Sequence, residues 1–421
     1  MSGKSIAAID IGTTSIYMLA AEVTEKGTRV LGSCTMASRG IRKGVVINIE
    51  EVSDSIRAAV SEVESVIGRK LLSAVIGISG QHIMGFLSKG LIGLHGREIT
   101  AVDRMRAIES AQTVYMPLDR EVLHTISTEF MLDGQGGITD PVGMSGVRLE
   151  STVHIITASS PSVQNLAKAC EQVGLEVLDI VFGPVATAEA VLTQDEIQQG
   201  ALLIDIGGGT TDIACFRDGA MVHTSVLGIG GLHITNDLAI GLKVSMAEAE
   251  RIKKTAGLAS VRALGGDETI EISEQDGQLQ KVSRQLIAAI IQPRCEELFE
   301  KVREEFRKYS AGDTVACSAV LTGGTALLRG LSGLAASGLA MHARVGLPQG
   351  LSGMKNILRT PSYAAVVGLA AYAAQKEEEA ALLHDRSAGI LARIMENIKN
   401  RFGYKDFLEL FQKKKKEVTY V

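Results

Sequence analysis

Residues Leu202–Phe216 read LLIDIGGGTTDIACF, and this stretch decides the fold. An apolar run ends in Asp205, three glycines follow, and the apolar pattern resumes at Ile213, which is typical of a strand, a tight turn and a second strand. Consecutive glycines let several backbone N–H groups point into one concavity, a geometry that holds phosphate oxygens. A carboxylate at the end of the first strand suits a hydrated Mg²⁺. The stretch therefore predicts a phosphate-binding turn beside a metal ion.

Two further glycine turns occur elsewhere in the chain. Residues Ile6–Leu19, IAAIDIGTTSIYML, repeat the strand, the DIGT turn and the return strand. Residues Val320–Gly330, VLTGGTALLRG, run from an apolar strand into a third turn and then a helical pattern. Each turn alone is equally consistent with an ordinary hairpin. Together, two phosphate turns that are each led by an aspartate predict a duplicated fold that closes on one nucleotide from both sides.

Two commoner phosphate motifs do not fit these turns. A P-loop requires G-x-x-x-x-G-K-[ST], and no glycine here is followed by that final pair in register. The glycines of a dinucleotide-binding turn open a helix, whereas both hairpins here lead into strands.

Length and composition favour a two-lobed protein in a reducing compartment. A chain of 421 residues is too long for one compact core and fits two lobes, and its 46% of hydrophobic residues can bury substantial cores. A net charge of −5 and the absence of Trp argue against a nucleic-acid partner. The five cysteines are scattered without a C-x-x-C pair, which argues against a structural metal. We expect no signal peptide and no transmembrane span, and a cytoplasmic protein.

The three turns, in this order, resemble the phosphate 1, phosphate 2 and adenosine motifs of the actin-like ATPase superfamily. Glu250 and Lys253 lie three apart on a predicted helix, and resemble the pair that holds ribose and adenine; alternatively they form an ordinary surface ion pair. The resemblance implies ATP and Mg²⁺ as cofactors, with Asp10 and Asp205 holding Mg²⁺ through water. The expected nucleotide-binding residues are Asp10, Gly12, Thr13, Thr14, Ser15, Asp205, Gly207, Gly208, Gly209, Thr210, Thr211, Glu250, Lys253, Gly323, Gly324 and Thr325.

Nearly the whole chain resembles the FtsA cell-division family. The resemblance is carried by ISGQHI at residues 78–83, by Pro184–Glu196, by the helix that starts at Ser245 and by the run Arg284–Arg294. It implies an α/β, actin-like two-lobed fold of duplicated ribonuclease-H-like domains, with a small inserted α/β subdomain (an SHS2 domain) and a C-terminal amphipathic tail.

The domain organisation expected from this resemblance has four subdomains and a tail. These are subdomain 1A (1–83 and 154–200), the inserted subdomain 1C (84–153), 2A (201–231 and 310–375), 2B (232–309), a linker (376–388) and the tail (389–421). Residues 75–79 and 154–159, which flank the insertion, are expected to be strands of the surrounding sheet.

The resemblance also implies a function. The chain would be a polymerising ATP-binding protein that anchors filaments of the tubulin-like GTPase FtsZ to the cytoplasmic face of the bacterial membrane at the division site. Its partners would be the C-terminal peptide of FtsZ, further copies of itself in a filament, and later division proteins through the inserted subdomain. Arg284 and Arg294, on the polar face of a long predicted helix in subdomain 2B, are the candidates for the FtsZ peptide.

The expected chemistry is ATP binding with slow hydrolysis. Gly183 stands where other superfamily members carry a Glu or Gln that orients the attacking water, and no catalytic residue is assigned. The alternatives are a sugar or acetate kinase, a chaperone, or a scaffold similar to the pilus-assembly protein PilM. A kinase needs a substrate cleft with a positioned base, and no segment distinctly offers one. A chaperone would need a further peptide-binding domain.

The C-terminal segment predicts a membrane-binding tail. From His384 onward it holds nine Lys plus Arg and five Asp plus Glu, so it is about +4 while the rest is negative. This charge and its apolar positions favour an anionic membrane surface, although a helix docked on the protein itself is the alternative. The residues expected to enter lipid are Ile390, Leu391, Ile394, Met395, Ile398, Phe402, Phe407, Leu408 and Phe411.

Overall fold

The computed structural model describes residues 4–24, 27–263, 268–274, 278–310 and 318–378. The chain divides into two compact units, residues 1–372 and 373–421. Of the second unit, the structure describes residues 373–378, which are helical, including residues 376–378 where a linker was expected to begin. All nine residues expected to enter lipid lie outside the described residues. Among the helices that the structure describes, none combines the length and the apolar character that a membrane-spanning segment requires.

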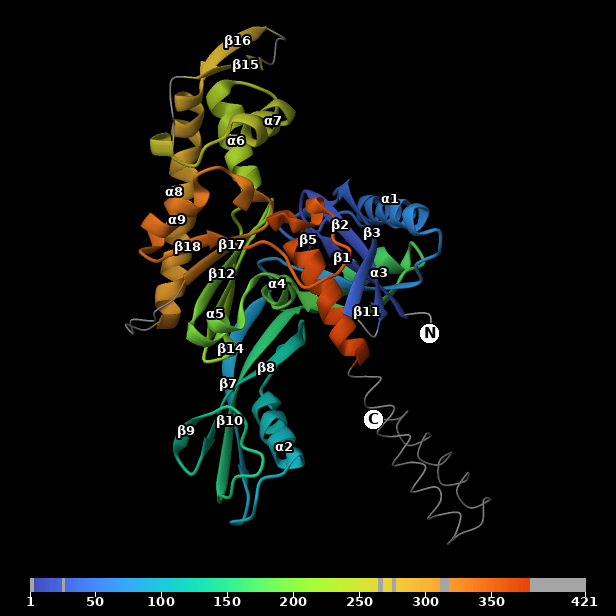
Figure 1. The fold of residues 1–421 in the computed structure, drawn as a ribbon, viewed down its shortest axis with the longest axis vertical. Helices are drawn as coiled ribbons and strands as arrows, with labels where there is room; N and C mark the ends of the chain where they lie inside the picture. Colours follow the sequence, from blue (N-terminus) through green and yellow to red (C-terminus); the bar gives the residue numbers. More distant parts are fainter. Residues whose placement is uncertain (1–3, 25–26, 264–267, 275–277, 311–317, 379–421) are drawn as a thin grey trace. The chain divides into compact units, whose positions relative to one another are not determined.

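The first half of unit 1 is built on a five-stranded sheet in the order β11-β6-β1-β2-β3 (Figure 1). Its hairpin strands β1 and β2 are antiparallel, as the first motif predicts, whereas β6 and β11 run parallel to β1. Helix α1 packs its apolar face on β2 and β3, with Asn48 capping its first turn. The elements are β1 (Lys4–Ile11), β2 (Ser15–Thr24), β3 (Gly27–Ala37), α1 (Ile49–Ile67), β6 (Ser73–Ile78), α3 (Ser160–Glu171) and β11 (Glu176–Phe182).

The second half repeats this arrangement with a sheet in the order β14-β13-β12-β17-β18. Strands β12 and β13 form the antiparallel hairpin of the second motif, and β17 runs parallel to β12 just as β6 does to β1. The predicted duplication is therefore confirmed strand by strand. The strands are β12 (Ala201–Ile206), β13 (Thr211–Arg217), β14 (Ala220–Leu227), β17 (Ser318–Thr322) and β18 (Ala343–Val345).

Helices cover the second sheet and form one apolar core with it. Leu202, Ile204 and Ile213 are fully buried against this helical layer, and each such side chain stabilises the fold by about 1.5–3 kcal/mol. Helix α8 includes Pro293 within its length. The elements are α6 (Gly231–Leu242), α7 (Met246–Ala256), β15 (Thr269–Ser273), β16 (Leu279–Ser283), α8 (Arg284–Ser310) and α9 (Leu331–Leu339).

Connecting elements complete unit 1. Helix α4 (Gly183–Val191) and the helical residues 364–372 connect the two halves, and α5 (Gln194–Gln199) follows α4. A short ladder of β4 (Ile41–Arg42) with β5 (Val45–Val46) precedes α1.

The inserted subdomain is a separate four-stranded sheet in the order β7-β10-β8-β9 with helix α2 packed on it. Thr100 and Asp103 form a capping box at the start of α2. One expectation is wrong: residues 154–159 belong to β10, which pairs with β7 and β8, and not to the surrounding sheet. The elements are β7 (Met84–Gly93), α2 (Ala101–Gln112), β8 (Arg120–Leu132), β9 (Gln135–Ile138) and β10 (Arg148–Ser159).

Candidate nucleotide-binding site

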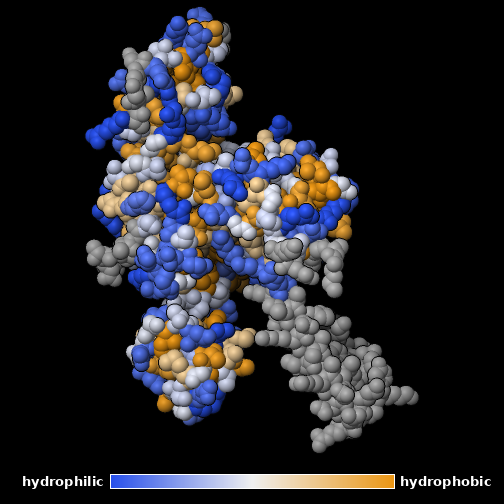
Figure 2. Space-filling view, viewed as in Figure 1, coloured by the Kyte–Doolittle hydropathy of each residue, from blue (hydrophilic) through white to orange (hydrophobic). Residues whose placement is uncertain are grey.

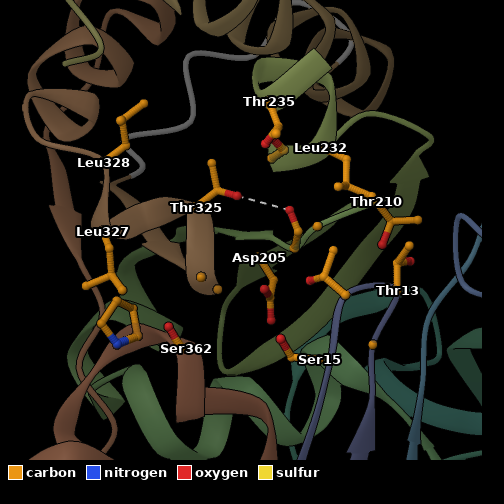
Figure 3. Close-up of a pocket in the computed structure, with 18 of the residues that line it drawn as sticks. Thr13, Ser15, Asp205, Thr210, Leu232, Thr235, Thr325, Leu327, Leu328 and Ser362 are labelled. Carbon is orange, nitrogen blue, oxygen red and sulfur yellow. Dashed lines mark hydrogen bonds between the residues drawn. The ribbon is translucent and has the colours of Figure 1, made fainter. Parts of the chain in front are cut away.

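The three predicted turns line one cavity of about 760 Å³ between the two halves of unit 1 (Figure 3). This volume lies within the usual range of small-molecule sites. Gly209 and Thr211, which were also expected to bind phosphate, do not line it. The expected residues that do line it are Asp10, Gly12, Thr13, Thr14, Ser15, Asp205, Gly207, Gly208, Thr210, Glu250, Lys253, Gly323, Gly324 and Thr325.

The two hairpin turns have the same backbone geometry. In the first, the Gly12 N–H donates to the carbonyl of Ser15 at 3.0 Å; in the second, the Gly207 N–H donates to the carbonyl of Thr210 at 2.9 Å. Each turn is closed by the same hydrogen bond three residues apart, so the duplication extends to the site itself.

The two turns also contact each other. A β-carbon at Gly208 would lie 2.5 Å from the side chain of Thr14, and one at Gly209 would lie 2.6 Å from Thr13 Oγ1. Glycine is therefore required here for close approach of the two halves, a reason that the phosphate motif alone does not reveal. Thr211 is fully buried, and its hydroxyl donates to the carbonyl of Ile229 at 2.8 Å. Gly209 and Thr211 thus shape the turn and do not face the cavity.

The two carboxylates that were predicted to hold Mg²⁺, Asp10 and Asp205, face this cavity. Burial raises the pKa of Asp10 to about 6. Burial and, secondarily, the negative charge of Asp10 raise the pKa of Asp205 to about 7, so the two predicted carboxylates do lie near each other. Desolvated carboxylates without a basic partner are stabilised in their charged form by a cation.

A magnesium ion fits these donors only with help from other oxygens. Within the described ranges, no group of three His, Cys, Asp or Glu side chains could hold a metal ion. Mg²⁺ usually keeps several waters and binds through one or two carboxylates plus substrate phosphates, and Asp10 and Asp205 match that pattern.

Asp212 is a third carboxylate at the cavity that the motif reading did not assign. It is the ladder partner of Asp205, whereas the equivalent partner of Asp10 is Tyr17. Burial, and then the charge of Asp205, raise the pKa of Asp212 well above its ordinary value, and Ser79 Oγ donates to its Oδ1 at 2.6 Å. A β-carbon at Gly183 would lie 3.7 Å from Asp212 Oδ2. A position-by-position comparison of the two hairpins would have found it.

Glu250 and Lys253 on α7 form a half-buried network beside the cavity. Lys253 Nζ lies 2.7 Å from Glu250 Oε2 and donates to Thr235 Oγ1 at 2.9 Å and to the carbonyl of Gly231 at 3.1 Å. Thr235 Oγ1 donates to Glu250 Oε2 at 2.6 Å. The Lys253 side chain is only 14% exposed, so the pair is not an ordinary surface ion pair. It links α7 to the first turn of α6.

The third turn packs directly on the second. Gly323 has φ +82°, and a β-carbon there would lie 2.4 Å from Asp205 Oδ1. Thr325 Oγ1 donates to the carbonyl of Gly207 at 3.0 Å, the dashed line in Figure 3. The helix expected from Ala326 to Leu331 is a 3₁₀ turn over Gly324–Leu327, and α9 starts only at Leu331.

Arg284 and Arg294, the candidates for the FtsZ peptide, are both held in ion pairs. Arg284 pairs with Glu268, and its side chain is only 13% exposed. Arg294 donates to both carboxylate oxygens of Asp237, at 2.7 and 3.1 Å, and also pairs with Glu297. Neither guanidinium is positioned by the structure as a free ligand for a peptide.

Comparison with known proteins identifies the family. The profile "Cell division protein FtsA" matches residues 202–368, and the profile "SHS2 domain inserted in FTSA" matches residues 80–157. The chain is 41% identical to the cell division protein FtsA of Pseudomonas aeruginosa over 90% of this chain and 91% of that protein. The chain belongs to the FtsA family of cell division proteins. Its identity to the FtsA protein of Neisseria meningitidis is 37%, covering 95% of this chain and 99% of that protein.

Solved structures confirm the actin-like fold expected for an FtsA family member. A PilM-PilN type IV pilus biogenesis complex aligns with a TM-score of 0.63 at 17% identity, covering 87% of this chain and 98% of that one. MreB 5 of Spiroplasma citri bound to AMPPNP aligns with a TM-score of 0.53 at 15% identity, covering 92% of this chain and 99% of that one. The likeness to PilM is therefore one of fold, whereas the likeness to FtsA extends through the sequence.

Proposed function

We propose that the chain binds ATP with Mg²⁺ in the cavity between the halves of unit 1, polymerises, and anchors FtsZ filaments to the membrane at the division site. The observation that carries the nucleotide proposal is the convergence of three glycine turns from two duplicated halves on one cavity. Membership of a cell-division family supports the division site, the FtsZ partner and self-assembly.

Each part of the cavity has a proposed role. The turns at Gly12–Ser15 and Gly207–Thr210 hold phosphates, because their backbones and hydroxyls line the cavity from both sides. Asp10 and Asp205 orient the waters of Mg²⁺, which neutralises phosphate charge when bound. Glu250, Lys253, Gly323 and Gly324 hold the nucleoside end. Isothermal titration calorimetry of the full chain with Mg·ATP tests this proposal, and an absence of saturable binding would overturn it.

The pH dependence of binding follows from the raised pKa values. Protons compete with Mg²⁺ for Asp10 and Asp205, whose pKa values of about 6 and about 7 are above the ordinary Asp value. Affinity for Mg·ATP is therefore expected to fall as the pH is lowered from about 8 to about 5.5. For each proton that Mg²⁺ must displace, the fall is up to about tenfold per pH unit. Calorimetry in two buffers of different ionisation enthalpy measures the protons released. Asp205→Asn, assayed at the higher concentrations that its weaker binding requires, retains the titrations of the nucleotide and of Asp10 and loses that of Asp205, so it should release fewer protons on binding.

Hydrolysis is expected to be slow. The attacking water has no side chain to orient it at Gly183, and water positioning is a major part of phosphoryl-transfer catalysis. Steady-state phosphate release should fall below about 1 s⁻¹, the low end for enzymes, and a kinase-like turnover would refute this. Gly183→Gln is expected to raise the rate, because a side chain there has room beside Asp212.

The tail and partner proposals rest on the sequence and on the family. We propose that residues 389–421 bind the membrane and that the inserted subdomain, residues 84–153, binds later division proteins. An FtsZ peptide would bind in subdomain 2B, and a carboxylate of that peptide would have to displace Glu268 from Arg284 or Asp237 from Arg294.

Truncation after Gln375 tests the membrane proposal. The truncated chain is expected to lose co-sedimentation with vesicles that contain anionic lipid, because the basic amphipathic segment is removed and each Lys or Arg near such a surface contributes about 1 kcal/mol. Calorimetry with Mg·ATP should show unchanged binding, which serves as the control for folding. Undiminished vesicle binding by the truncated chain, with or without ATP, would contradict the proposal.

A further inference from the structure

Strand β14, the edge of the second sheet, lies between two different layers. Its side chains alternate between its faces. His223 and Ser225 face α8, where the His223 ring stacks on Tyr309 with centroids 5.5 Å apart and Ser225 Oγ donates to Glu305 Oε2 at 3.2 Å. Thr224 points the other way, toward the inserted sheet, and β14 lies beside β7 and β8 in Figure 1.

The inserted sheet is tightly seated on β14. Thr224 Oγ1 lies 3.1 Å from His154 Nε2, and the two residues are 4% and 1% exposed. A β-carbon at Gly85 would lie 2.2 Å from Thr224 Oγ1 and 2.7 Å from the His154 ring. The backbone of β7 therefore rests directly on Thr224. We call this contact of Gly85, His154 and Thr224 the β14 seat.

The same insertion is fixed to the first half of unit 1. Arg120 Nη2, at the start of β8, donates to the carbonyl of His82 at 2.9 Å. The Phe182 N–H, at the end of β11, donates to His124 Nε2 on β8 at 2.9 Å. The insertion thus contacts both halves whose turns line the nucleotide cavity, so any change in the angle between the halves must alter one of its two contacts.

Strand β14 is also connected to the phosphate turn. It pairs along its length with β13, where Leu227 is opposite Thr211 and Thr224 is opposite Ala214. In this structure the turns of the two halves are in contact and the β14 seat is formed. The contact between the turns and the formed seat therefore occur in the same conformation.

We propose that the inserted subdomain is a nucleotide-responsive brace, whose β14 seat forms when the two halves close on the cavity. Packed interfaces of this kind switch between arrangements and do not deform continuously. The insertion exposes the apolar side chains of Leu87, Leu91 and Val147. Figure 2 shows apolar patches on the insertion, the lobe at the bottom of the view. Nucleotide binding would in this way control the orientation of the insertion's apolar surface relative to the two halves. This inference rests on the proposed function, because it needs a nucleotide in the cavity.

Coupling of this kind is reciprocal: a seat that helps closure must also raise nucleotide affinity. Gly85→Val opens the seat, because its side chain would overlap Thr224 and His154. Gly93→Val is the matched control on the same strand, since a β-carbon there meets no atom within 4 Å. Gly85→Val is expected to raise the dissociation constant for Mg·AMPPNP by about 5-fold to 100-fold, and Gly93→Val to leave it within about twofold of the original.

Hydrogen exchange on the unmodified full chain tests the same inference without any substitution. Saturating Mg·AMPPNP is expected to slow exchange in residues 84–93 and 220–227 as well as at the cavity. Calorimetric binding with unchanged exchange in residues 84–93 would overturn the inference and leave the proposed function standing. So would a normal affinity in Gly85→Val. If Gly85→Val does not fold, as judged by circular dichroism, the exchange result alone decides. An absence of nucleotide binding by the unmodified chain would overturn both.

Discussion

Replacing Asp205 with asparagine is expected to stabilise the nucleotide-free protein at pH 8 and to remove most of its affinity for Mg·ATP. Burial raises the pKa of this carboxyl to about 7. A carboxyl whose pKa is higher in the folded than in the unfolded state lowers stability once it is ionised, and this cost grows as the pH rises from about 4 to about 7. Each unit of pKa difference corresponds to about 1.4 kcal/mol. The neutral amide should therefore raise the free energy of unfolding by on the order of a few kcal/mol at pH 8, and by little at pH 4.

The affinity of Asp205→Asn for Mg·ATP should fall, although its stability at pH 8 rises. An amide cannot orient the waters of Mg²⁺ as a carboxylate does, and losing such a partner costs about 10-fold to 100-fold in affinity. Urea denaturation at both pH values and calorimetry with Mg·ATP measure the two effects. Asp195→Asn, at an exposed position of α5, is the matched control and should change neither. If Asp205→Asn is destabilised equally at both pH values, or if it binds Mg·ATP with the original affinity, the assigned role of Asp205 is contradicted.

Replacing Gly368 with alanine is expected to be the most disruptive single-methyl change in the described part of the chain. Gly368 lies in the helical residues 364–372, which cross α4 so closely that a β-carbon would be 1.9 Å from the carbonyl oxygen of Ala186 and 2.4 Å from its carbonyl carbon. Both atoms belong to the backbone, so the two helices must separate. Overpacking of this kind costs about 1–3 kcal/mol or more, and here it acts on both connections between the halves.

Gly333→Ala is the matched control for this prediction. Gly333 also lies within a helix, α9, but a β-carbon there meets no atom within 4 Å. Because alanine favours a helix over glycine by about 1 kcal/mol, Gly333→Ala should be neutral or stabilising in urea denaturation. Equal stability of the two variants would show that the crossing of α4 with residues 364–372 is looser than the structure has it.

The parts of the fold that were predicted from sequence are those with a local signal. Glycines just after a strand-ending aspartate mark both hairpin turns wherever the rest of the chain lies, so the hairpins and their duplication were correctly located, and 14 of the 16 residues expected to bind nucleotide line the cavity. Gly209 and Thr211 do not line the cavity because of what they face: the side chain of Thr13 in one case and the carbonyl of Ile229 in the other.

Long-range partners have no such signal. Residues 154–159 were correctly expected to form a strand, but periodicity does not say which sheet a strand joins, and β10 is buried by the insertion's own layers and by β14. The charges of Arg284 and Arg294 were visible in the sequence. Their partners Glu268 and Asp237, 16 and 57 residues away, were not.

The central claim is that the three glycine turns hold one nucleoside triphosphate between the two halves. It is tested most directly by an experimental structure of the full chain with Mg·AMPPNP. We predict the triphosphate between the turns at Gly12–Ser15 and Gly207–Thr210, with the metal facing Asp10 and Asp205. An empty cavity at saturating ligand, or phosphates bound elsewhere on the chain, would contradict the account.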